Sequence, residues 1–154
     1  MGRAPDPERV GRRAAYVREQ VERLRELAGI TDEAAFTQPR SWLPAAVRYA
    51  FQTAIEGLID IAYHVCARRY AYAAPDARSA FRRLLEAGRL PAALWTKVDA
   101  MVGFRNLLVH GYDVVSDAQI YRILRDEAGD IEAVLVSLEA VARDVTAAEG
   151  EPTS

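Results

Sequence analysis

The residues that could do chemistry gather in one stretch, Phe104 to Tyr112, which holds one of the two histidines of the 154-residue chain. Within it, Arg105, His110 and Tyr112 fit the pattern Arg-x4-His-x-Tyr. An arginine can bind a phosphate group through two parallel hydrogen bonds, and an imidazole can take up or release a proton near neutral pH. This stretch is therefore the main candidate for a functional site.

Arg105 and His110 fit the requirements of RNA cleavage without a metal ion. Such cleavage needs a group that takes the 2′-OH proton, a group that protonates the leaving oxygen, and a cation that stabilises negative charge at phosphorus. Arg105 could supply the cation and His110 the leaving-group proton, and His110 of either of two chains could take the first proton.

The spacing of the two residues bears on how such a site is built. On an ideal helix a separation of five positions places Arg105 roughly 140° around the axis from His110. A long arginine side chain could still reach the same phosphate as His110. A site built by two chains about a two-fold axis is the sharper prediction.

The same residues also have a purely structural interpretation. Arg105 could pair with Glu56 or Asp60, and His110 could bind carbonyl groups at the end of a helix. For an isolated Arg-x4-His pattern this interpretation is favoured, because short motifs match by chance.

Apolar spacing predicts the helix that carries the motif. After Pro91, which suits the first turn of a helix, apolar residues recur at three- and four-residue steps up to the motif. Gly111 marks the expected end. His110 then lies in the final turn, where the helix dipole favours a protonated imidazole.

Similar reasoning predicts the rest of the fold. Three helices are predicted before the motif helix: one from Pro7 to Gly29, one that begins near Pro44 and runs to about Tyr70, and a short one. A last long helix is predicted after it. Asp76 is the expected N-cap of the short helix, which stops at Gly88, and residues 31–41 are expected to form a connector. The last helix, from Asp117, is predicted to be continuous, with any bend at Gly129, because the apolar spacing survives that glycine. No segment shows strand alternation, so we predict an all-α, up-and-down bundle of four main helices plus a short one.

Composition bounds the class of protein. With 51% hydrophobic and 27% charged residues, the chain is typical of a soluble, cytoplasmic globular protein, without a signal peptide or a membrane-spanning run. We expect a single domain, 1–154, with disordered tails at 1–7 and 149–154. Cys66 is alone and predicted to be a buried, inert thiol, and no Cys/His spacing suggests a metal site. A net charge of −2 argues against binding nucleic acid by bulk charge, although all but one of the 20 basic residues are arginine.

Glu56, Asp60 and His64 form a polar stripe at successive fourth positions of the second long helix, roughly opposite its apolar face. Two interpretations stay open: a solvated face, or a lining of the cleft of a dimer. His64 is not assigned a catalytic role.

Two segments resemble one protein family. Residues 101–112 are similar to the signature of HepT-like proteins of the HEPN superfamily, and residues 48–62 resemble the second helix of that family. The order of the predicted helices also agrees along nearly the whole chain. The resemblance implies a homodimeric, metal-independent endoribonuclease, the toxin of a toxin–antitoxin pair.

The resemblance also implies roles for individual residues. Arg105 and His110 would be catalytic, and Asn106 would support the site. Glu56 and Asp60 are further candidates for site support, through the interpretation in which their stripe lines the cleft of a dimer. The cognate antitoxin, an MntA-like nucleotidyltransferase, would transfer AMP from ATP to Tyr112, so the toxin itself would need no cofactor. AMP on Tyr112 would place a bulky anion two residues from His110 and repel RNA.

A rival hypothesis is a non-catalytic, HEPN-like dimer that acts as a binding partner or scaffold for a nucleotidyltransferase. The intact Arg105, His110 and Tyr112 favour the enzyme, whereas the acidic pI of about 5.7 mildly favours the scaffold. A plain structural bundle would explain the apolar spacing but not the motif.

Overall fold

The computed structural model describes residues 2–111 and 114–144, and these residues form seven helices and no strand. The prediction of an all-α fold is confirmed. The helices are α1 (Pro7–Gly29), α2 (Glu33–Phe36), α3 (Leu43–Tyr70), α4 (Ala77–Glu86), α5 (Ala92–His110), α6 (Asp117–Asp126) and α7 (Ala128–Arg143). None of the described helices is long and apolar enough to cross a membrane.

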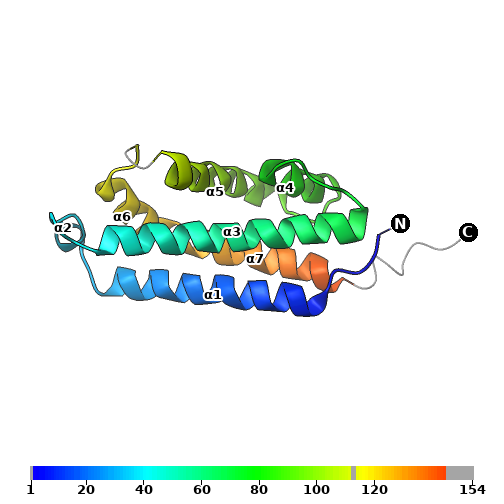
Figure 1. The fold of residues 1–154 in the computed structure, drawn as a ribbon, viewed down its shortest axis with the longest axis horizontal. Helices are drawn as coiled ribbons and strands as arrows, with labels where there is room; N and C mark the ends of the chain where they lie inside the picture. The colour runs from blue at the N-terminus through cyan, green and yellow to red at the C-terminus, as the bar shows by residue number, and fades with distance from the viewer. Residues whose placement is uncertain (1, 112–113, 145–154) are drawn as a thin grey trace, which may run out of the picture.

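Helix α3 runs through the middle of the molecule, with α1 along one side and α4 and α5 along the other (Figure 1). It contacts α1, α4, α5, α6 and α7. Its buried residues include adjacent positions, such as Gly57, Leu58 and Ile59, so the helix is apolar around most of its circumference. In contrast, α1 buries a single stripe, largely at three- and four-residue steps.

Polar side chains begin several helices. Asp6 accepts hydrogen bonds from the N–H groups of Glu8 and Arg9 at the start of α1. Asp76 accepts one from Ser79 N–H at 2.8 Å, which confirms it as the N-cap of α4. Ser116 forms a capping box at the start of α6. Local sequence therefore fixes where these helices begin.

The last helix is not continuous, so that prediction was wrong. Glu127, with φ −121° and ψ −5°, leaves helical geometry and separates α6 from α7. The break lets α6 turn toward α2, where the rings of Tyr121 and Phe36 lie 5.4 Å apart, while α7 packs along α1 and α3. The connector predicted for residues 31–41 likewise contains a short helix, α2.

The segment before α1 lies against the end of α3. Arg68 Nε donates to the carbonyl of Ala4 at 3.1 Å, and Asp6 N–H donates to His64 Nε2 at 2.8 Å. Ala4 and Asp6 belong to the segment 1–7 for which we expected disorder. The expected disordered tail 149–154 lies outside the described residues.

Cys66 is fully buried, and its Sγ donates to the carbonyl of Ala80 at 3.3 Å. Burial raises the pKa of the thiol to about 11. The prediction that the thiol is buried is confirmed, its raised pKa disfavours the reactive thiolate, and the contact with Ala80 ties α3 to α4.

Gly57 allows α1 and α3 to approach each other closely. A Cβ atom at this position would lie 2.5 Å from Cγ2 of Val17, which is fully buried on α1. Because the side chain of valine is branched at Cβ, Val17 has little freedom to move away. The absence of a side chain at Gly57 therefore allows the two longest helices to pack this closely.

We expect Gly57→Ala to destabilise the protein by about 1 kcal/mol, since overpacking typically costs roughly 1–3 kcal/mol and the better helix propensity of alanine offsets part of this. Chemical denaturation measures the change. The double variant Gly57→Ala/Val17→Ala should be less destabilised than the sum of the two single variants. Strict additivity would show that the two residues do not clash.

Candidate functional site

Helix α5 ends at His110, as predicted, and Gly111 follows it. Gly111 N–H donates to the carbonyl of Leu107 at 2.8 Å, and Val114 N–H donates to the carbonyl of Gly111 at 2.9 Å. A Cβ atom at Gly111 would lie 3.3 Å from both Leu107 O and Val114 Cγ2. Val114 is therefore held close to the end of α5.

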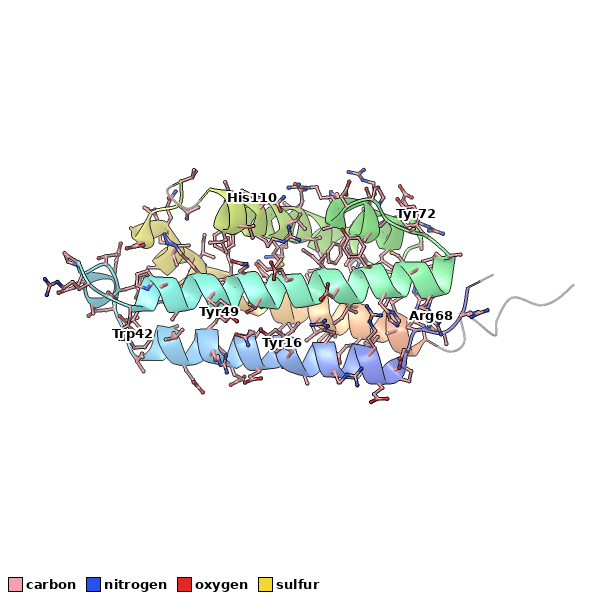
Figure 2. The ribbon with its side chains drawn as sticks, viewed as in Figure 1. Tyr16, Trp42, Tyr49, Arg68, Tyr72 and His110 are labelled. Atoms are coloured by element: carbon pink, nitrogen blue, oxygen red, sulfur yellow. The ribbon has the colours of Figure 1, made fainter. Side chains whose placement is uncertain are left out.

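His110 is exposed on the outer surface of α5, away from α1 (Figure 2). Within the described residues its imidazole makes no hydrogen bond. The structural interpretation, in which His110 binds carbonyl groups at the helix end, is therefore not supported by this part of the chain. Its proton-transfer atoms are open to an incoming group.

Arg105 is half-buried and is held by its neighbour. Its Nη1 donates to Oδ1 of Asn106 at 2.9 Å, which orients the guanidinium. Its Nε is buried and has no hydrogen-bond partner among the described residues. Asn106 thus lies where a residue that supports Arg105 would be expected.

In the described part of the chain, Arg105 does not pair with Glu56 or Asp60, the partners that the structural interpretation predicted. Glu56 accepts a hydrogen bond from Gln52 Nε2 at 3.3 Å, and Asp60 Oδ2 lies 3.6 Å from Arg13 Nη2 on α1. The polar stripe on α3 therefore makes contacts along its own helix and toward α1. Within the described residues no ion pair joins it to Arg105.

Arg105 lines an open cleft of about 490 Å³ between α3, α4 and α5. Tyr63 of α3 also lines this cleft. Burial raises the pKa of the Tyr63 hydroxyl, the negative charges of Asp76 and Asp60 raise this pKa further, and the positive charge of Arg105 lowers it. His110 is not among the residues that line this cleft. In the described part of the chain, this cleft therefore contains Arg105 without His110.

A second, smaller pocket lies between α3 and α5 beside the motif, and Tyr49 and Leu107 both line it. Arg48, from the same pocket, donates through Nη2 to the carbonyl of Val115 at 2.6 Å and pairs with Asp117 at 3.1 Å. Arg48 thus fastens the chain that follows the motif to α3. This role was not predicted from the sequence, although Arg48 begins the segment that resembles the second helix of the family.

Tyr112, the predicted site of modification, lies outside the described residues. Among the residues that are described, no group of three side chains is placed to hold a metal ion.

A family model described as "Ribonuclease HepT-like" matches residues 17–138. The chain therefore belongs to the HepT-like ribonuclease family. No curated protein matches it.

Solved structures share the fold. A tri-AMPylated HEPN toxin of Shewanella oneidensis in complex with an MNT antitoxin is 22% identical, with a TM-score of 0.77 over 88% of this chain and 99% of that one. A toxin–antitoxin structure with AMP-PNP is 21% identical, with a TM-score of 0.74 over 88% of this chain and 99% of that one. At these identities the likeness establishes the all-α fold.

Proposed function

We propose that this protein is a metal-independent endoribonuclease toxin whose activity depends on Arg105 and His110. The observation that carries the proposal is the intact Arg-x4-His-x-Tyr pattern at the end of α5 in a chain of the HepT-like ribonuclease family. The half-buried Arg105, oriented by Asn106, suits a phosphate contact, and the exposed His110 suits proton transfer.

The proposed active unit is a homodimer. Arg105 faces the cleft toward α4, while His110 lies on the outer surface, so a second chain would supply the missing partner for each. Exposed apolar side chains beside the motif support the proposal that a second chain covers this surface: Tyr49 is 60% exposed and Leu107 is 41% exposed. We propose that Glu56 and Asp60 line the cleft of this dimer.

In the proposed reaction, the phosphoryl group moves from the 5′-oxygen of one nucleotide to the 2′-oxygen of the preceding one. His110 takes the proton of the 2′-OH, and the 2′-oxygen attacks phosphorus. The bond from phosphorus to the 5′-oxygen breaks, and the same imidazole, now protonated, gives that oxygen a proton. Arg105 stabilises the negative charge at phosphorus, and the products are a 2′,3′-cyclic phosphate and a 5′-OH.

Regulation by an antitoxin is part of the proposal. A nucleotidyltransferase partner would transfer AMP from ATP to Tyr112, two residues after His110. The similar HEPN toxin described as tri-AMPylated and bound to an MNT antitoxin supports this. The added phosphate would repel the RNA backbone. We place this pair in the cytoplasm, where RNA and ATP are both present.

We expect the purified, unmodified protein to cleave single-stranded RNA. His110→Ala removes a proton-transfer group and Arg105→Ala removes the cation that stabilises charge at phosphorus, so each should lower the rate at least about 100-fold. Gel analysis of labelled RNA measures cleavage. Arg122→Ala, at an exposed position on α6, is the matched control and should keep wild-type activity. Equal rates in all the variants would contradict the proposal. No cleavage by wild type would favour the scaffold, the candidate that the net charge of −2 supports.

Incubation with the partner nucleotidyltransferase and ATP should add adenylate to Tyr112 and abolish cleavage, because the new anion blocks the phosphate site. Peptide mass spectrometry locates the modification, and Tyr112→Phe should stay unmodified and active. Adenylate found only on other residues would show that the regulatory assignment is wrong.

A further inference from the structure

The cleft that Arg105 lines extends well beyond the motif. Three arginines line it, Arg78 and Arg82 from α4 and Arg105 from α5. Its volume of about 490 Å³ falls in the range of small-ligand sites, so a nucleotide unit fits. Neither the motif nor the proposed reaction uses the two arginines of α4.

Both arginines of α4 are held in place by α5. Arg78 Nε donates to Asp99 Oδ1 at 2.7 Å, and the guanidinium carbon of Arg82 lies 5.6 Å from the centre of the Trp95 ring. A guanidinium over an aromatic face keeps its N–H groups available for a phosphate. Arg82 forms no ion pair with an acidic residue of the described chain, so its charge remains available.

The balance of charge in the cleft favours an anion. Among the described residues that line it, Asp76 is the one acidic residue, and its carboxylate already accepts the hydrogen bond from Ser79 N–H. Arg78 is paired with Asp99, and Arg82 and Arg105, which form no ion pair among the described residues, still outnumber Asp76. Arg105 Nε, buried and without a partner among the described residues, adds a donor that an acceptor would satisfy.

We propose that this cleft binds a phosphodiester of the RNA strand next to the bond that is cut, with Arg82 and Arg78 as its cationic contacts. This inference rests on the proposed function. Arg105 lies where the cleft meets the motif and so connects the two phosphate positions. Tyr63 offers a ring on which a base can stack.

The test measures RNA affinity in the His110→Ala background, which prevents cleavage. Fluorescence anisotropy with a labelled single-stranded RNA of mixed sequence should show Arg82→Gln to weaken binding about tenfold and to lower the slope of log K against log salt by about 0.7 for the lost phosphate contact. Arg82 is exposed, so the variant should fold, which circular dichroism checks. Arg122→Gln is the matched control and should bind as the parent does.

The outcomes separate this inference from the proposed function. If wild type cleaves RNA and Arg82→Gln binds RNA as tightly as its parent, the cleft does not bind a phosphate. The proposed nuclease function would still hold in that case. Equal weakening by Arg82→Gln and Arg122→Gln would also overturn the inference, because it would reflect net charge alone. If wild type neither binds nor cleaves RNA, the proposed function fails and the inference fails with it.

Discussion

The burial of α3 by the surrounding helices is the constraint on which the candidate site depends. Gly57 allows α1 to pack closely on one side, and on the other side the rings of Phe51 and Phe104 meet edge to face at 5.6 Å. Phe104 directly precedes Arg105. This aromatic pair and the buried side chains of Val98, Val102 and Leu108 together set the rotation of α5 and with it the direction of the motif side chains.

This rotation separates the two proposed catalytic residues. Arg105 enters the cleft toward α4, whereas His110 lies on the exposed surface near the end of α5. Arg48 fastens the chain after the motif to α3 through the carbonyl of Val115. The proposal of a two-chain site rests on these positions, because His110 does not line the cleft that Arg105 lines.

Features set by local sequence could be predicted. The end of α5 at His110 and the cap at Asp76 depend on residues within a few positions. The break at Glu127 could not be predicted, because the apolar spacing continues through it and the turn is set by packing of α6 against α2. Periodicity places Arg105 on a helix but does not say which side chain its guanidinium contacts, so it could not reveal that Asn106, rather than Glu56 or Asp60, holds Arg105. The roles of these residues stay predictions.

The most direct test of the two-chain site mixes inactive subunits. Arg105→Ala and His110→Ala chains, combined under conditions that exchange subunits, form mixed dimers in which one site retains Arg105 from one chain and His110 from the other. Cleavage of labelled RNA by the mixture, well above that of either variant alone, is the result expected for a composite site. Mixed dimers that form, as mass spectrometry of the intact complex would show, and yet remain as inactive as the parent variants would contradict it.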